Sequence, residues 1–252
     1  MILKKMQETG YGKNINSKKD FIPMGTFKNE IIKKVFEFSW GMSFGQVGEH
    51  RDHRSGGSKN RKNGEIFANT FQGKLSEFAV YDQMYSEFKD GLNEPDLEQY
   101  GLGQWDNADF EINGKRISVK STKSFGNLLL LETKDWNSNG QYKPNLSKKQ
   151  SDYDVFILVR INTHCEDLLK RMRALYSDKV EKQLLLDNIK NEVWKYDIPG
   201  FITNEDLKYI IRNEFVIKKG EMLNGNILMD AENYYIQAGD MRNIKYAFEM
   251  MK

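Results

Sequence analysis

The fold of this chain is decided by one stretch, Trp105-Asp-Asn-Ala-Asp-Phe-Glu-Ile-Asn-Gly-Lys-Arg-Ile-Ser-Val-Lys-Ser-Thr-Lys123. It predicts two short strands, at residues 109–112 and 116–121, with a tight turn at Asn113-Gly114 between them. Asn-Gly between apolar-rich strands is the strongest short-range signal for a two-residue hairpin turn. The centre of the fold is therefore predicted to contain an antiparallel hairpin.

The two predicted strands carry an acid and a lysine. Asp109 opens the first strand, and Lys120 lies inside the second. Because side chains alternate between the faces of a strand, Ser118 and Lys120 should share the face opposite to Ile117 and Val119. An acid and a lysine across a hairpin can hold a divalent metal beside a charged amine, an arrangement that suits hydrolysis of a phosphodiester.

The arrangement resembles the PD-(D/E)xK nuclease core, in which an Asp on one strand is followed by Asp/Glu-x-Lys on the next. More narrowly, the chain resembles type II restriction endonucleases over roughly residues 40–245. An amphipathic helix, Gly73-Lys-Leu-Ser-Glu77-Phe-Ala-Val-Tyr, precedes the hairpin. Further segments that carry the resemblance are the strands Leu128-Leu-Leu-Leu-Glu132 and Tyr153-Asp-Val-Phe-Ile-Leu-Val-Arg160, and the segments 199–203 and 230–242.

The resemblance implies an α/β fold with a restriction-endonuclease-like core, a mixed central sheet flanked by helices and an additional helical C-terminal region. It also implies Mg²⁺-dependent cleavage of a specific double-stranded DNA sequence. In the family, the residue matching Asp109 binds the metal. The residue matching Lys120 orients or deprotonates water, and the backbone carbonyl at Val119 also coordinates metal.

The chain departs from the family at Ser118, where Asp or Glu is usual. The Ser118 hydroxyl could hold a metal-bound water, but it cannot replace the missing charge. Glu77 or Glu132 could supply the missing carboxylate, and Asp106 is the runner-up to Asp109 as metal ligand. Each acid could instead have no role in catalysis. Glu77 would then be an exposed helical residue, Glu132 a charge at the end of a strand, and Asp106 the cap of a turn. Asp109 could equally be a strand-start carboxylate that bonds local backbone.

A basic, Gly/Ser/Asn-rich segment at residues 50–64 could bind DNA. It concentrates five cations, which are Arg51, Arg54, Lys59, Arg61 and Lys62. Arginines can read guanine edges in the major groove or hold phosphates. The alternative is a solvated linker. Lys123 is a further candidate phosphate contact near the hairpin.

Composition limits the alternatives. The 252 residues suffice for one large domain, and 39% hydrophobic residues rule out wholesale disorder. No apolar run reaches the length of a membrane span, no signal peptide is expected, and the single cysteine excludes an internal disulfide framework. These features predict a cytoplasmic protein, and the resemblance to restriction enzymes implies a bacterial one. The net charge of +2 is by itself a weak argument for nucleic acid.

We expect a single nuclease domain. Its parts are a polar N-terminal arm (1–25), the basic loop and a helix (40–70), the catalytic core (71–161) and a helical region for recognition or dimerisation (162–252). Helical periodicity predicts helices over 29–38 and 66–87 and a helix or helix pair over 165–193. Thr203 and Asp206 predict a capping box at the start of another helix.

Symmetry suggests a homodimer on a palindromic site, because one hairpin supplies one hydrolytic centre and a double-strand break needs two. Its surface could come from seven C-terminal residues, which otherwise form ordinary core: Tyr234, Tyr235, Met241, Tyr246, Phe248, Met250 and Met251. A cognate DNA methyltransferase is expected in the same system. The rival hypotheses are a structure-directed repair or recombination nuclease and a catalytically decayed DNA-binding protein.

Overall fold

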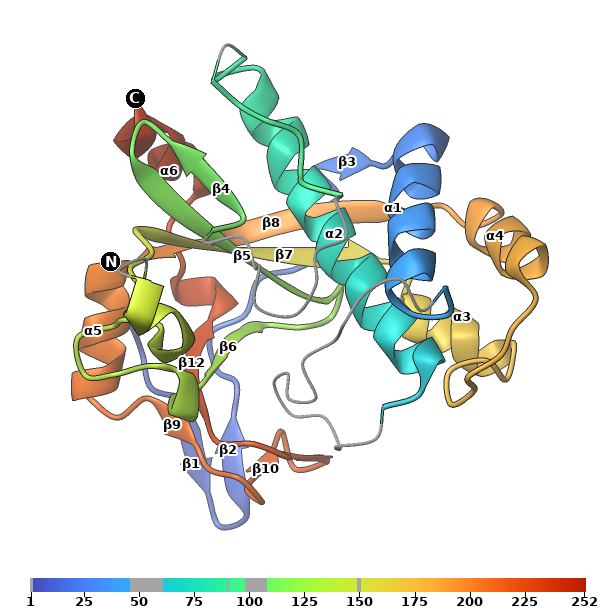
Figure 1. Cartoon of the computed structure of the whole chain (residues 1–252). Coiled ribbons are helices and arrows are strands. Elements are labelled where there is room, and N and C mark those ends of the chain that lie inside the picture. Colours follow the sequence, from blue (N-terminus) through green and yellow to red (C-terminus); the bar gives the residue numbers. More distant parts are fainter. Residues whose placement is uncertain (1, 46–60, 90, 98–107, 149–150) are drawn as a thin grey trace.

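A mixed five-stranded sheet forms the centre of the computed structural model, which describes residues 2–45, 61–89, 91–97, 108–148 and 151–252 (Figure 1). The strand order is β3 (Gly25–Thr26), β8 (Lys195–Thr203), β7 (Val155–Asn162), β5 (Lys115–Lys123) and β4 (Phe110–Ile112). Strands β5 and β7 run parallel, and the other neighbouring pairs run antiparallel. The chain is therefore mixed α/β, as predicted.

The predicted hairpin is confirmed, with a longer second strand than expected. Strands β4 and β5 pair antiparallel, from Phe110 opposite Ile117 to Ile112 opposite Lys115. Between them Asn113 has a φ of 49° and Gly114 a φ of 74°. Both values lie in the left-handed region that a two-residue hairpin turn of type I′ requires.

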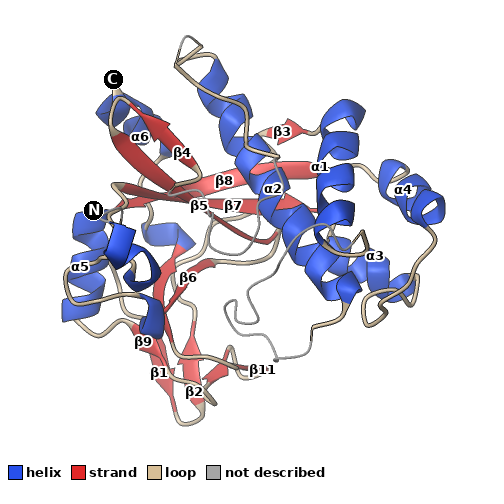
Figure 2. Cartoon of the chain, viewed as in Figure 1, coloured by secondary structure: helices blue, strands red, loops and turns tan. Residues whose placement is uncertain are grey.

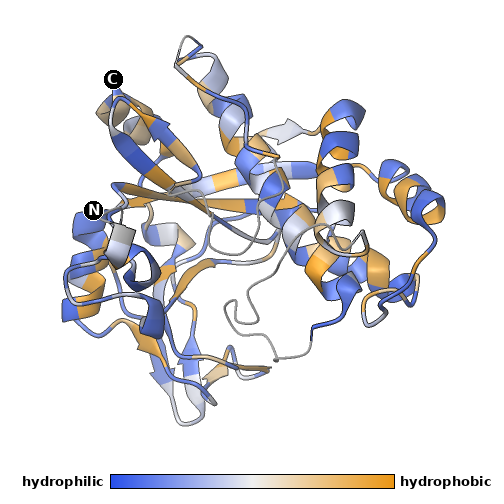
Figure 3. Cartoon of the chain, viewed as in Figure 1, coloured by the Kyte–Doolittle hydropathy of each residue, from blue (hydrophilic) through white to orange (hydrophobic). Residues whose placement is uncertain are grey.

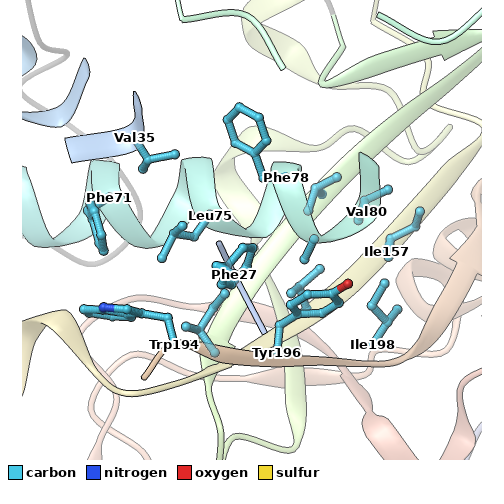
Figure 4. Packing of buried hydrophobic residues seen from close by; sticks show 14 of the residues in the cluster. Phe27, Val35, Phe71, Leu75, Phe78, Val80, Ile157, Trp194, Tyr196 and Ile198 are labelled. Carbon is cyan, nitrogen blue, oxygen red and sulfur yellow. The ribbon is translucent and has the colours of Figure 1, made fainter. Parts of the chain in front are cut away.

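Five helices contribute to a hydrophobic core on one face of the central sheet. They are α1 (Asn29–Met42), α2 (Asn63–Tyr85), α3 (Cys165–Arg171), α4 (Lys182–Lys190) and α6 (Ile244–Met251). Helix α2 crosses the sheet and packs Phe71 and Leu75 toward Trp194 and Phe27 (Figure 4). The predicted helices at 29–38, 66–87 and 165–193 are thus confirmed, the last as a helix pair.

A second core lies on the other face of the sheet, beneath helix α5 (Asn204–Arg212). Strand β7 serves both cores: Ile157 and Val159 face the first, and Phe156 and Leu158 face the second. A strand covered on both faces reads as a continuous apolar run, as its colouring in Figure 3 shows. The predicted capping box of α5 is confirmed, because Thr203 and Asp206 each bond the other's backbone N–H.

The predicted strand at 128–132 forms, but it does not join the central sheet. As β6 (Leu128–Glu132), it belongs to a three-stranded sheet with β12 (Asn233–Gln237) and β9 (Val216–Ile217) (Figure 2). The physical reason is that β4 and β7 already pair with the two sides of β5. The chain after β5 therefore has to find another partner, which is β12.

The first 25 residues are not a loosely packed arm. Strands β1 (Gln7–Thr9) and β2 (Gly12–Asn14) form a four-stranded sheet with β10 (Met222–Leu223) and β11 (Ile227–Leu228), and β3 joins the central sheet. Met6 is buried, and its N–H donates to the Tyr235 hydroxyl at 3.0 Å.

Residues 162–252 are not purely helical, because they also contain strands β8 to β12. Strand β8 contains a proline, Pro199. In the structure it lies at a register shift, where Leu158 pairs with Gly200 and Arg160 with Asp197. A proline is tolerated at such a bulge because its missing N–H interrupts no ladder bond.

The irregular connections include three 3₁₀ turns, η1 (Thr133–Asp135), η2 (Lys143–Lys148) and η3 (Ala238–Asp240). Within the described ranges, no helix combines the length and apolarity needed to cross a lipid bilayer.

Candidate active site

Asp109 is held against the middle of the predicted catalytic strand. Its backbone N–H donates to the Ile117 carbonyl at 3.0 Å, and its Oδ2 accepts a hydrogen bond from the Val119 N–H at 2.6 Å. The carboxylate therefore lies beside the segment Ser118-Val119-Lys120. A hydrogen bond to local backbone is what a purely structural role of Asp109 predicts. The same hydrogen bond also keeps the acid beside the strand that was predicted to be catalytic.

Ser118 and Lys120 occupy the predicted face of β5. They pair with Phe156 and Leu158 of β7, which face the second core, whereas Ile117 and Val119 belong to the first. Ser118 is only 2% exposed, and Lys120 is half-buried. The two side chains thus differ in access to solvent: the serine is enclosed, and the lysine lies closer to the surface.

Glu77 comes from the other side of the sheet. Helix α2, which carries it, packs on the face of β5 that holds Ile117 and Val119. The Glu77 carboxylate forms an ion pair with Lys74 one helical turn earlier, at 2.7 Å. Helix α2, which carries Glu77, therefore lies on the Ile117 and Val119 face of β5.

Glu132 ends strand β6 in a separate sheet, opposite Asn233 of β12. Its side chain is only 1% exposed and forms an ion pair with Lys134 through Oε2. Among the described residues, Oε1 of Glu132 has no hydrogen-bond partner. Glu132 is thus a buried carboxylate rather than the plain strand-end charge, although it does not share a sheet with Asp109.

No cluster of three or more His, Cys, Asp or Glu side chains able to hold a metal occurs among the residues that the structure describes. Asp106, the alternative ligand, lies outside those residues. The described part of the site thus offers one carboxylate and one amine: Asp109, which contacts β5, and Lys120, which lies on β5. Mg²⁺ commonly takes only one or two protein carboxylates and completes its shell with water and substrate phosphate, so this donor set fits the ion.

The predicted DNA-contacting residues fall into two groups. Arg51, Arg54 and Lys59 lie outside the described residues. Lys62 forms an ion pair with Asp178 at 2.6 Å, and Lys123 with Glu166 at 3.1 Å. Arg61 is half-buried just before helix α2.

The aromatic and Met residues near the C-terminus are mostly core. Four of the seven are buried, namely Tyr235, Met241, Phe248 and Met251. Tyr246 and Met250, one turn apart on α6, are 58% and 49% exposed, and Tyr234 is half-buried. Burial therefore rules out a dimer surface built from the whole set. Only Tyr246, Met250 and Tyr234 of this set remain accessible enough to contribute to such a surface.

Sequence reasoning missed one arrangement of polar side chains. Ser124 follows β5, and His164 follows β7; the two side chains meet, with Asp167 on the other side of the histidine ring. The available signal was a serine and a histidine placed directly after two strands. That signal has meaning only once β5 and β7 are known to be parallel neighbours.

Comparison of this chain with protein-family models, with curated proteins and with solved structures gave no match.

Proposed function

We propose that this protein is an Mg²⁺-dependent endonuclease that cleaves double-stranded DNA at a specific sequence, as type II restriction enzymes do. One observation carries the proposal: the hydrogen bond from the Val119 N–H to Asp109 Oδ2, 2.6 Å long. It joins the acid that opens the hairpin to the strand segment that carries Lys120. The acid therefore lies beside the strand segment that carries the lysine, at the open end of the hairpin.

In this proposal each residue has a defined task. Asp109 would hold the metal through its carboxylate, together with the Val119 carbonyl oxygen. The metal would neutralise charge on the scissile phosphate and lower the pKa of water. Lys120 would orient or deprotonate the attacking water. Because its side chain is half-buried, fewer orientations are open to the amine than on an exposed surface. Buried Ser118 would contribute at most a neutral hydrogen bond.

The test is digestion of plasmid DNA by the wild-type protein and matched pairs of variants, with and without Mg²⁺. Asp109→Asn and Lys120→Ala should each slow cleavage at least ~10²-fold, the usual effect of removing a metal ligand or a general base. Asp154→Asn is the control for Asp109, because its Oδ2 also accepts from a β5 backbone N–H, that of Arg116 at 2.9 Å. Lys115→Ala is the control for Lys120, on the same strand but exposed.

The outcomes separate the candidate functions. Discrete fragments that require Mg²⁺, Asp109 and Lys120 support the proposal, together with a cognate methyltransferase that would protect host DNA. Cutting restricted to junctions or other irregular DNA would favour a repair or recombination nuclease. Binding of DNA without cleavage would favour a non-catalytic protein. Sedimentation with a cognate duplex would test the homodimer, and a monomer that cuts both strands in sequence would exclude it.

A further inference from the structure

A serine, a histidine and an aspartate form a hydrogen-bonded chain at one edge of the central sheet. The Ser124 Oγ lies 3.1 Å from His164 Nε2, and the His164 Nδ1 lies 3.0 Å from Asp167 Oδ2. The order of contacts is that of a nucleophile, a general base and the acid that orients the base. None of these three residues takes part in the proposed nuclease chemistry.

The fold brings the three residues together through two parallel strands. Ser124 begins the turn after β5, which Gly126 closes by donating its N–H to the Lys123 carbonyl at 2.7 Å. His164 precedes helix α3, two residues after the end of β7. Because β5 and β7 are parallel neighbours, with Lys123 opposite Ile161, both ends meet at the same sheet edge (Figure 1). In open α/β sheets, ligands commonly bind at the carboxyl ends of such strands.

The hydrogen bonds define the tautomer of the histidine. The backbone N–H of Ser124 also donates to His164 Nε2, at 3.3 Å, so Nε2 acts as an acceptor. In a neutral ring the proton then resides on Nδ1, where it faces Asp167. This is the tautomer that can accept the proton of the Ser124 hydroxyl.

Asp167 is suited to orient the ring. Burial by itself would raise the pKa of Asp167, but the hydrogen bond to His164 and the charge of Lys123 lower that pKa overall. The carboxylate is therefore ionised at neutral pH and can stabilise the positive charge that forms on the ring when the serine loses its proton.

The surroundings indicate the class of substrate. Ser124 is half-buried, and its neighbour Phe125 is 68% exposed. The Phe125 ring lies edge-on to the His164 ring, with the centroids 5.2 Å apart. An apolar side chain beside a nucleophile offers a contact for an apolar acyl group. The adjacent thiol of Cys165 is buried, and burial raises its pKa, so the serine is the accessible nucleophile here.

We infer that Ser124, His164 and Asp167 form a second, metal-independent hydrolytic site that acts on carboxylic esters with an apolar acyl group. Ser124 Oγ attacks the carbonyl carbon while His164 Nε2 takes the hydroxyl proton. The bond to the alkoxy group then breaks, and His164 returns the proton to the leaving oxygen. Water, deprotonated in turn by His164, attacks the acyl-serine; the acid is released and Ser124 regains its proton. Ser124 and His164 are catalytic residues, and Asp167 is a positioning residue.

The experiment uses an alkyl fluorophosphonate probe on the full-length protein in EDTA. Ser124 Oγ would form a bond to phosphorus, fluoride would leave, and the hydroxyl proton would pass to His164. Mass spectrometry should find one adduct, at Ser124, that is absent in Ser124→Ala. Ser177→Ala is the matched control, because Ser177 is also a half-buried turn serine, but its Oγ bonds local backbone in place of a histidine. It donates to the Lys179 carbonyl at 2.6 Å and accepts from the Lys179 N–H at 3.0 Å.

His164→Gln should slow labelling at least ~10²-fold. Asp167→Asn should slow it ~10-fold or more, and Asp167→Glu should restore part of the rate, while the unfolding midpoints of the variants stay near wild type. Hydrolysis of p-nitrophenyl butyrate should change in parallel. Labelling of Ser124 no faster than that of Ser177, or unchanged labelling in His164→Gln, would overturn the inference. Because EDTA removes Mg²⁺, this result is independent of the nuclease test.

Discussion

At the scale of single residues, the neighbours of each charge decide what that charge can do. Lys123 was predicted to contact phosphate from its sequence position beside the hairpin. In the structure its ammonium lies 3.1 Å from Glu166 and 3.6 Å from Asp167. Lys170 lies beside the same two acids, 2.5 Å from Glu166 and 4.0 Å from Asp167. Two ammonium groups and two carboxylates balance one another, so Lys123 brings no surplus positive charge that would attract a phosphate.

This arrangement predicts that Lys123 contributes little to binding of DNA. Each phosphate contact adds about 0.9 to the slope of log affinity against log salt concentration. Lys123→Ala should therefore leave that slope unchanged, whereas Arg61→Ala should lower it by about 0.9. Fluorescence anisotropy of a labelled duplex at several salt concentrations, without Mg²⁺, measures both slopes. A fall of about 0.9 in Lys123→Ala would show that the lysine leaves its acids to bind phosphate.

At the scale of elements, the hairpin turn determines the register of β4 and β5 and hence the position of Asp109. Gly114 has a φ of 74°, and a methyl group added there would meet no atom within 4 Å. A substitution at Gly114 therefore tests backbone conformation alone. Gly73 has equally open surroundings, but it lies inside helix α2 with no positive φ.

Alanine should have opposite effects at the two glycines. Gly114→Ala should lower the free energy of unfolding by about 1 to 2 kcal/mol, the cost of a left-handed conformation for an L-residue. Gly73→Ala should raise it by up to about 1 kcal/mol, because alanine is the better helix former. Urea denaturation of both variants checks the pair. Equal changes in the free energy of unfolding at the two glycines would contradict the left-handed conformation assigned to Gly114.

At the scale of the whole molecule, one buried arginine ties the N-terminal segment to the central sheet. The Arg160 guanidinium of β7 bonds Asp197 of β8 through Nε at 2.8 Å and through Nη2. It also donates to the carbonyls of Lys19 and Asp20, at 2.8 and 2.7 Å. The pair is almost fully buried, with side chains 1% and 6% exposed. Three distant parts of the chain therefore depend on the same group.

Removing this guanidinium should destabilise the entire fold. Arg160→Ala should lower the free energy of unfolding by about 3 to 5 kcal/mol, because Asp197 would be left buried without its partner. The same change should speed proteolysis within the first 25 residues. Arg171→Ala is the control: it breaks an exposed ion pair with Glu192 and should cost about 0 to 1 kcal/mol. Similar decreases in the free energy of unfolding in the two variants would show that the Arg160–Asp197 pair contributes no more than an exposed ion pair.

The sequence by itself determined the features that depend on residues close along the chain. The Asn113-Gly114 turn, the alternation along β5, the stripes of α1 and α2 and the capping box at Thr203 all arise from contacts within a few residues. The placement of Asp109 across the hairpin from β5 also followed, because a two-residue turn leaves little freedom of register. These predictions needed no knowledge of the rest of the fold.

Only the tertiary structure decided which distant segments meet. Strand β6 leaves the central sheet because both sides of β5 are already paired, and helix α2, which carries Glu77, packs on the first core. Ser124 and His164 are 40 residues apart and touch only because β5 and β7 are parallel. The hydrogen-bonding edge of a strand and the apolar face of a helix can each pair with several partners, so no local sequence pattern specifies the partner. The packing of the whole chain selects it.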